Sequence, residues 1–451
     1  MKKMTLFLYL FSIFISGYAS ARLLSKNDPE YYYEVLNNIY IKYPIYYDSE
    51  NIPNEFHNYI HTSFDLKYEN RILDSYILEG GWYKPSEVTD TLFRDFVIEN
   101  GNLFNFGFKT YYGNDFFAQF IADFRLGDTT YFKYGNYNIF NLPRIDFVSL
   151  DFPTFSYLSY KKGSFDFLIG RIPLSYGPMK YNLVLSDNSP YYDAMNISYN
   201  LSDKLSYDFA ILSMVPQLSK NEQEKMEEQF VNFRNAFYNG INYKFSENLF
   251  FGLSSLNQVA GRLPNPINVF IKSDVGIYGG YLKIIPFYGI NFDGECAINY
   301  NTLTSSYGIG ISKIFDGKSS KFKVGYERYW IEDNFFSSEN PYHNLYYRTI
   351  ALSNEPGARI FFDYPFGFKY GENSKIGSLE LILVFDTAYI SYIWDYGTNS
   401  LGRLNNHNIS FLWNTKIGKF GIDWMQLKNA ENEFETFNLK YLFEVNIRLP
   451  K

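Results

Sequence analysis

The sequence predicts an all-β protein, a transmembrane antiparallel β-barrel of the outer-membrane type with a small irregular or helical N-terminal extension. Three observations predict this fold. The chain begins with a secretory leader, apolar and polar side chains alternate at every second position, and several alternating runs are long enough to cross a bilayer. With roughly 20 to 24 residues for each strand and its share of loop, we expect about 14 to 18 strands, with 16 to 18 preferred.

Composition excludes several other classes of protein. The chain has 451 residues, of which 45 are Phe, 44 Tyr and 5 Trp, and its hydrophobic content of 46% is too high for a disordered chain. A single cysteine excludes a disulfide scaffold and a cysteine-based metal cluster. A mean hydropathy of -0.25 excludes a bundle of transmembrane helices, since each helix needs a run of about 20 apolar residues.

The first 21 residues have the pattern of a signal peptide. Lys2 and Lys3 precede an apolar stretch from Leu6 to Ile15, and the small residues at 19–21 suit a cleavage site. Removing residues 1–21 changes the formal net charge from -7 to -9, which argues against nucleic acid as a partner. We therefore expect export and a place in the cell outer membrane, with lipid and the barrel assembly machinery as partners.

A period of two dominates from about residue 100 onward. The clearest run covers the twelve residues 438–449, with Leu439, Tyr441, Phe443, Val445, Ile447 and Leu449 on one face. A strand of a soluble sheet averages about 5–6 residues, whereas a strand that crosses a membrane needs about 9–11. The length of this run therefore favours a barrel wall.

Short and long connections alternate along the chain, as they do at the two rims of an outer-membrane barrel. Short turns are expected at Lys162-Gly163, at Asp316-Gly317, at Gly418 and in the similar segments 199–205 and 243–249. Long polar loops are expected over 127–143, 172–192, 215–234, 258–273, 331–347 and 396–406. In the third of these loops, Ser219 and Glu222 match a capping box for a short helix.

The chain divides into a signal peptide (1–21), an N-terminal extension (22–99) and the barrel (100–451). The extension is less regular, with a possible short helix near residues 28–38 and a possible first strand around Phe64 to Tyr68. We expect it to pack at the periplasmic rim or in the lumen.

Aromatic and charged residues occupy the expected wall in two different ways. Aromatic residues near strand ends would form girdles at the membrane interfaces, with Tyr191, Tyr192, Tyr326, Tyr329, Trp330, Tyr346, Tyr347, Trp394, Trp413 and Trp424 as candidates. Charged residues on the polar face would line the lumen, with Lys109, Asp123, Arg125, Lys440, Glu444 and Arg448 as candidates. Such a charged lining favours a general diffusion porin for small polar solutes.

Motifs for catalysis and metal binding are missing from the sequence. It contains four histidines and no nucleophile elbow, zinc-protease motif, phosphate-binding loop or dinucleotide fingerprint. We therefore expect no enzymatic activity, no catalytic residue, no metal site and no cofactor.

One dense group of polar and aromatic residues stands out between Gly170 and Pro190. A strand that ends in Gly-Arg is followed by a Gly-Pro turn and by hydroxyl, amide and aromatic side chains, which suit hydrogen bonding and stacking with sugar rings. Two interpretations are open. The segment contacts a ligand, or it is a constriction loop folded inward and held by Arg171 and Asp187.

The same residues carry a resemblance to a known family. The Gly170-Arg171 pair, the Tyr176-Gly177-Pro178 turn, the run Leu183-Val-Leu-Ser-Asp-Asn-Ser-Pro190 and Met195 resemble a segment of the Wzi-type capsule assembly family. The resemblance implies an outer-membrane barrel with an N-terminal helical portion that binds capsular polysaccharide and helps to hold it at the cell surface. By this resemblance, the positions expected to contact glycan are Arg171, Tyr176, Ser186, Asp187 and Asn188.

Three functions therefore follow as hypotheses. The first is a barrel that binds surface or capsular polysaccharide and aids its assembly or retention. The second is a general diffusion porin. The third is a surface-exposed adhesin or antigen, which the polar loops at 215–234 and 331–347 favour.

Overall fold

The structure is a computed structural model of the chain. The described residues are 22–24, 31–32, 36, 42–43, 45–47, 56–72, 82–83, 102–113, 115–126, 145–146, 156–189, 191–224, 231, 233–261, 274–286, 289–352, 359–400, 402–415, 418–428 and 433–449. The expected signal peptide (1–21) and the expected loop 127–143 lie outside them.

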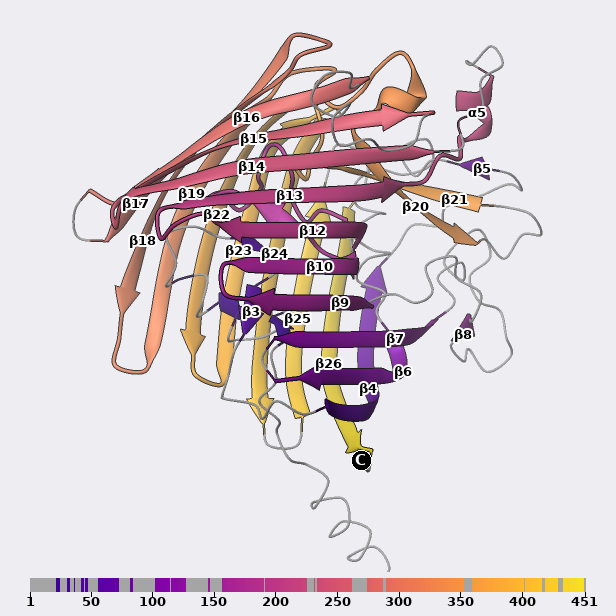
Figure 1. Cartoon of the computed structure of the whole chain (residues 1–451), viewed down its shortest axis with the longest axis vertical. Helices are drawn as coiled ribbons and strands as arrows, with labels where there is room; N and C mark the ends of the chain where they lie inside the picture. The colour runs from indigo at the N-terminus through magenta and orange to yellow at the C-terminus, as the bar shows by residue number, and fades with distance from the viewer. Residues whose placement is uncertain are drawn as a thin grey trace, which may run out of the picture.

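The described strands form a closed antiparallel barrel (Figure 1). Its wall contains β4 (Phe56–Ile72), β6 (Asn102–Tyr112), β7 (Phe116–Leu126), β9 (Tyr157–Lys162), β10 (Phe165–Ile172), β12 (Tyr192–Asn200), β13 (Leu205–Met214), β14 (Arg234–Ser246), β15 (Leu249–Ala260), β16 (Val275–Ile284), β17 (Ile290–Asn299), β18 (Thr304–Asp316), β19 (Ser320–Ile331), β22 (Ser374–Phe385), β23 (Ala388–Asn399), β24 (Gly402–Thr415), β25 (Gly418–Lys428) and β26 (Glu433–Arg448). A nineteenth segment, β8 (Ile145–Asp146), pairs with the end of β7. Without it the described wall has eighteen strands, and the predicted all-β barrel of 14 to 18 strands is confirmed.

The ring closes because the last strand pairs with the first. β26 pairs with β4 over fourteen positions, from Glu435↔Ile72 to Arg448↔Tyr59, and β9 pairs with both β7 and β10. The wall therefore begins at Phe56, well before residue 100, and the possible strand around 64–68 is part of β4. Closure matters because an open sheet edge would leave unpaired backbone groups in lipid, where each costs several kcal/mol.

The expected short turns are confirmed where they are described. Gly163 lies in the turn between β9 and β10 with a φ of 58°, which glycine adopts without steric cost. The segments 199–205 and 243–249 connect β12 to β13 and β14 to β15.

The prediction of a long loop at 396–406 is wrong. β23 continues to Asn399 and β24 begins at Gly402, so the two strands meet in a tight connection. The asparagines of this segment look like loop residues in the sequence, but Asn406 is a buried wall residue. A polar lumen accepts such residues on the inner face of a strand.

Side chains alternate between the two faces of the wall. The outer face carries large apolar residues with high exposed fractions, such as Phe108 (52%), Ile311 (45%) and Trp413 (49%). The inner face carries buried polar and charged residues, such as Asn196 and Asp395. This is the division that a transmembrane barrel requires, with apolar side chains toward lipid and polar ones toward the lumen.

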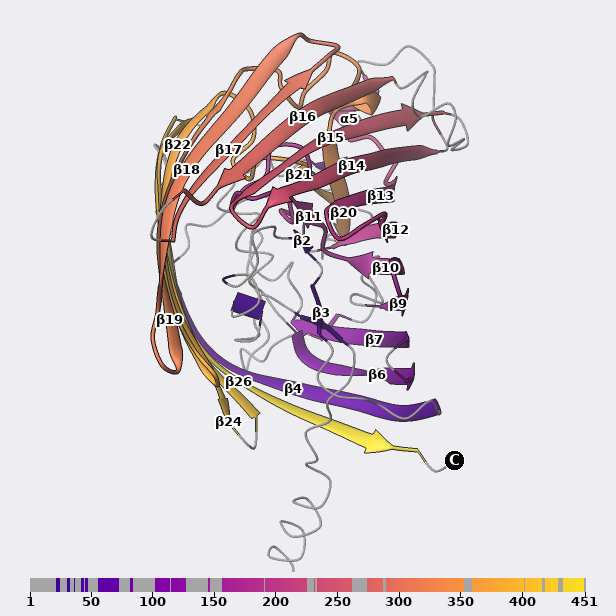
Figure 2. The same cartoon turned by 60° about the vertical axis from the view of Figure 1, so that its left-hand side comes forward.

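Several segments lie inside the wall or at its rim. Figure 2 shows β2 (Lys42–Tyr43) and β11 (Ser175–Tyr176) within the barrel, where they pair with each other. The long connection between β19 and β22 forms the 3-10 helix η2 (Pro341–His343) and the hairpin of β20 (Tyr346–Leu352) and β21 (Arg359–Pro365), which β5 (Trp82–Tyr83) joins in parallel. β1 (Arg22–Leu24) pairs with β3 (Ile45–Tyr47).

Part of the N-terminal extension packs on the inner wall. The described residues 31–32 and 36 are helical, and the ring of Tyr32 lies 4.4 Å from that of Tyr389 on β23. Leu36 packs with Ile382 and Val384 near the short turn that joins β22 to β23. In the described part of the chain, no helix is both long enough and apolar enough to span a membrane.

We predict that a charge on the outer face near mid-strand destabilises the barrel in lipid. Ile311→Lys should lower the free energy of unfolding in lipid vesicles by about 2–4 kcal/mol, because the ammonium must leave water. Denaturant titration of vesicle-inserted protein measures this change. Ser319→Lys, in the exposed turn of the same hairpin, is the matched control. Equal unfolding midpoints for the two variants would contradict a lipid-facing position for Ile311.

Candidate functional site

The chain leaves the wall after β10 and folds into the lumen before β12 begins. We call the described residues 173–189 and 191 the inward segment. Its backbone turns back on itself, with the N–H of Tyr176 donating to the carbonyl of Leu185 at 3.2 Å. Leu174, Leu183 and Leu185 are fully buried within the main hydrophobic cluster. The inward fold, which was one of the two open interpretations of this group, is what the structure shows.

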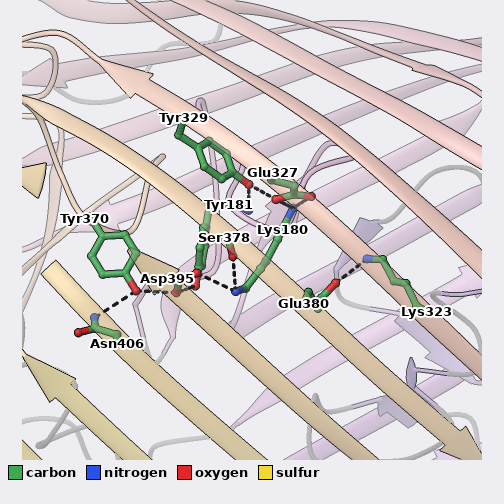
Figure 3. Close-up of polar contacts among 10 residues, drawn as sticks. All are labelled: Lys180, Tyr181, Lys323, Glu327, Tyr329, Tyr370, Ser378, Glu380, Asp395 and Asn406. Carbon is green, nitrogen blue, oxygen red and sulfur yellow. Dashed lines mark hydrogen bonds and ion pairs between the residues drawn. The ribbon is translucent and has the colours of Figure 1, made fainter. Parts of the chain in front are cut away.

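Lys180 fastens the inward segment to the far wall (Figure 3). Its Nζ lies 3.3 Å from Oδ1 of Asp395 on β23 and 3.0 Å from the hydroxyl of Ser378 on β22. Its backbone N–H is 3.2 Å from both carboxylate oxygens of Glu327 on β19. One residue of the segment thus bonds to three wall strands.

Asp395 is the meeting point of these contacts. Besides Lys180, its Oδ2 accepts hydrogen bonds of 2.6 Å from the hydroxyls of Tyr181 and Tyr370. Burial raises the pKa of the Tyr181 phenol well above its usual value, and the neighbouring Asp395 charge adds to this shift. The phenol therefore keeps its proton and donates to the carboxylate. Three donors on one buried carboxylate compensate for its lost hydration.

The wall presents further acidic groups to the inward segment. Glu295 on β17 accepts from the N–H of Leu183 at 2.9 Å, and Glu327 also accepts from the hydroxyl of Tyr329. Behind these contacts, Lys323 and Glu380 form an ion pair of 2.6 Å between β19 and β22. Backbone N–H groups and one lysine of the segment thus meet carboxylates of the wall.

Glycines in the wall make room for the inward segment. A Cβ on Gly308 would lie 2.9 Å from the sulfur of Met179, and a Cβ on Gly279 would overlap the side chain of Val184. Farther along the same arc of the wall, Tyr176 of the segment stacks on Tyr238 of β14, with ring centroids 4.3 Å apart. Contacts of the segment therefore extend along the wall from β12 through β23, and the segment occupies this side of the lumen.

Arg171 lies apart from the other predicted site residues. It shares the outward face of β10 with the exposed Ile169, and its Nε donates to Oδ1 of Asp193 at 2.7 Å. Its guanidinium also lies 4.8 Å from the ring centroid of Tyr191. Because consecutive strand residues alternate between the two faces, Arg171 falls on the outer phase of β10 and points away from the inward segment.

The other predicted site residues belong to the inward segment. Tyr176 is buried, and its hydroxyl donates to Asn196 at 2.8 Å. The N–H of Ser186 donates to the carbonyl of Phe366 at 2.6 Å, and Asn188 donates to the carbonyls of Pro365 and Gly367. Asp187 is partly exposed between them. The structure thus brings Ser186, Asp187 and Asn188 together at the hairpin of β20 and β21, and a glycan-binding role for them stays a prediction.

The predicted lumen charges are only partly described. Lys109 shares the face of β6 that carries the buried Tyr111. The backbone of Asp123 and Arg125 is in β7 and that of Lys440, Glu444 and Arg448 is in β26, but their side chains lie outside what the structure describes.

Several residues of the site were missed by the sequence analysis. Glu295, Glu327 and Asp395 stand on the inward phase of their strands, so alternation could have placed them in the lumen. Lys180 lies within the Gly170–Pro190 group and was passed over. No sequence signal pairs it with Asp395, because 215 residues separate the two.

A second buried network holds the rim loops. The capping box is confirmed, since the N–H of Ser219 donates to Glu222 at 2.8 Å and the N–H of Glu222 donates to Ser219 at 3.3 Å, at the start of α5 (Lys220–Gln223). Glu222 also accepts from Arg348 of β20, which forms a bidentate pair with Asp363 of β21 at 2.6 and 2.7 Å. In the described part of the chain, no group of three or more His, Cys, Asp or Glu residues is placed to hold a metal ion.

Comparisons with known proteins support the fold. No family model and no curated protein matches the chain. Among solved structures, it is similar to Wzi of Escherichia coli, described as an outer membrane protein involved in group 1 capsule assembly and a carbohydrate-binding β-barrel, with a TM-score of 0.57, 10% identity and coverage of 94% of this chain and 99% of that one. OccK5 (OpdH) of Pseudomonas aeruginosa aligns with a TM-score of 0.47, 9% identity and coverage of 88% and 100%. The fold is that of an outer-membrane β-barrel.

We predict that Lys180 holds the inward segment closed. In a Cys296→Ser background, Ser186→Cys places a probe at a site that is buried in the closed segment. Lys180→Met should speed thiol labelling at position 186 about 5- to 150-fold, because losing a hydrogen-bonded charge costs about 1–3 kcal/mol of local opening free energy. Lys321→Met, which breaks the exposed pair with Asp316, is the control. Unchanged labelling in Lys180→Met would refute the fastening role.

Proposed function

We propose that this protein is an outer-membrane barrel that binds surface polysaccharide at its long-loop rim and helps to retain it. The observation that carries the proposal is the inward segment itself. It fills part of the lumen, while the backbone N–H of Ser186 and the side-chain amide of Asn188 donate to backbone carbonyls at the end of the β20–β21 hairpin. A rim fixed in this way suits a preformed binding surface, which loses less entropy when a flexible polymer binds.

Two further observations support a binding role. The segment next to the rim combines a partly exposed carboxylate, Asp187, with amide and hydroxyl groups, and these are the groups that hydrogen-bond sugars. The resemblance of Gly170 to Met195 to the Wzi-type family agrees with the fold similarity to Wzi, which is described as carbohydrate-binding. Binding and retention require no catalysis, in keeping with the expectation that the protein is not an enzyme.

The general diffusion porin is the second candidate, and charged residues facing the lumen favour it. Lys283 and Asp293 lie 3.8 Å apart on the inner wall, and Lys323 pairs with Glu380. These charges are paired with one another, however, and the inward segment lies along the same arc of the wall. The adhesin or antigen hypothesis stays a prediction, and residues 225–230 and 232 of the loop 215–234 that favours it lie outside the described residues.

We predict that Asp187→Ala reduces glycan retention at the cell surface. Loss of a charged hydrogen-bond partner should weaken glycan affinity about 10- to 100-fold. A strain that lacks the gene is complemented with each variant, and cell-bound and released polysaccharide are quantified. Asp316→Ala, at the opposite rim, is the control for carboxylate loss. Normal retention in Asp187→Ala, with a barrel that assembles normally, would refute the proposal.

We also predict that the purified wild-type protein shows no steady porin-like conductance in planar bilayers. The inward segment occupies one side of the lumen, and we expect it to hinder solute passage while the Lys180–Asp395 contact holds it in place. Lys180→Met should therefore increase the frequency of open events, while Lys321→Met should not. A stable open current in the wild type would favour the porin instead.

A further inference from the structure

The outer wall carries a group of three cations near the long-loop rim. Arg328 on β19, Lys375 on β22 and Arg403 on β24 all share the outward phase of their strands with exposed residues. None of the three forms an ion pair with a described residue. This differs from Arg171, another outward cation near the same rim, which is paired with Asp193.

The three cations lie near one another at the long-loop rim. Lys375 is opposite Trp330 of β19 and Thr398 of β23, and Thr398 is opposite Arg403. Arg328 is opposite Gly377, two residues along β22 from Lys375. Diagonal neighbours of this kind are about 7–8 Å apart, and two strand spacings between Lys375 and Arg403 amount to about 10 Å. A single anionic headgroup can therefore contact all three side chains.

Acidic residues are missing from the outer face around this group. Every described outward position on β16 to β19 and on β22 to β24 is apolar, aromatic, neutral polar or basic. In the adjoining loop, the carboxylate of Glu332 accepts the N–H of Ser305 at 2.6 Å. Five acidic residues of the same strands, Asp293, Glu295, Glu327, Glu380 and Asp395, face the lumen instead.

Aromatic rings surround the cations and hold Arg328 in place. Its guanidinium lies 5.7 Å from the ring centroid of Trp330 and 6.0 Å from that of Tyr396. The hydroxyls of Tyr326 and Tyr396 are 2.9 Å apart, and Trp330 stacks on Tyr307 with centroids 4.8 Å apart. Rings at this height are typical of the membrane interface, where headgroups lie.

We propose that this outer surface, formed by Arg328, Lys375 and Arg403 among aromatic rings, binds the phosphate-bearing headgroup of a glycolipid in the outer leaflet. The long-loop rim of an outer-membrane barrel faces the cell exterior, so the site lies at the outer interface. Phosphate oxygens accept charge-assisted hydrogen bonds from arginine and lysine. The faces of the surrounding rings suit the sugar portion of the headgroup. The site is on the lipid side of the wall and is separate from the proposed polysaccharide surface.

Binding to the detergent-solubilised full-length protein tests this proposal. Diphosphorylated lipid A, the same glycolipid without its phosphates, phosphatidylglycerol and inorganic phosphate are the four probes, and bound lipid is counted by native mass spectrometry. We expect lipid A to bind at least about tenfold more tightly than its dephosphorylated form, and the triple variant R328Q/K375Q/R403Q to lose this preference. Lys313→Gln, which removes an outward cation near the short-turn rim, should keep it.

Four results would overturn the proposal. They are equal binding of the dephosphorylated glycolipid, a preference that persists in the triple variant, equal binding of phosphatidylglycerol, and displacement of lipid A by inorganic phosphate. The three single glutamine variants guard against misfolding of the triple variant, since each should lose part of the preference while the barrel keeps the heat stability of the wild type.

Discussion

The rest of the structure depends on one constraint: a closed wall of strands gives every second side chain to lipid and every other one to the lumen. The backbone of the wall is satisfied by ring closure from β26 to β4. The outer phase can then be apolar, but the inner phase collects buried polar groups that need partners. Asp395 shows the consequence, since it is buried at the wall and takes its partners from Lys180, Tyr181 and Tyr370. The inward segment is thus the means by which one side of the lumen satisfies its own carboxylates.

The same constraint explains what the sequence could and could not predict. The alternation of residues 438–449 and the turn glycines are local signals, so the barrel, the approximate strand number and several hairpins were predictable. The polar residues at 396–406 led to the wrong prediction of a loop. Asn406, for example, is typical of a loop in the sequence but is an inner-wall residue that donates a hydrogen bond to Tyr370. The aromatic residues predicted to form interfacial girdles fall into two groups. Trp330, Trp394 and Trp413 are on the outer phase, whereas Tyr192, Tyr329 and Tyr347 are buried within the barrel.

The candidate site was harder to predict because its partners are distant in the chain. The Gly170–Pro190 group was recognisable as unusual, and its inward fold was one of the two interpretations. Its contacts with Glu295, Glu327 and Asp395 depend on which strands face each other across the lumen, and this requires the full ring. The face of the wall on which Arg171 lies could not be predicted for a different reason. One step in strand phase separates the inner face from the outer face, so a residue at the end of a strand cannot be assigned to the adjacent loop by proximity in sequence.

Charge on this barrel is divided between the two compartments that the wall separates. On the described inner face from β16 to β24, Asp293, Glu380 and Asp395 form ion pairs with Lys283, Lys323 and Lys180. The outer face of the same strands holds cations and no described carboxylate. A charge near lipid that lacks a partner is costly, and the cost falls when the membrane supplies the counter-charge. The paired inner charges find their counter-charges within the protein, whereas Arg328, Lys375 and Arg403 form no ion pair with a described residue, so an anionic headgroup of the membrane would supply their counter-charge.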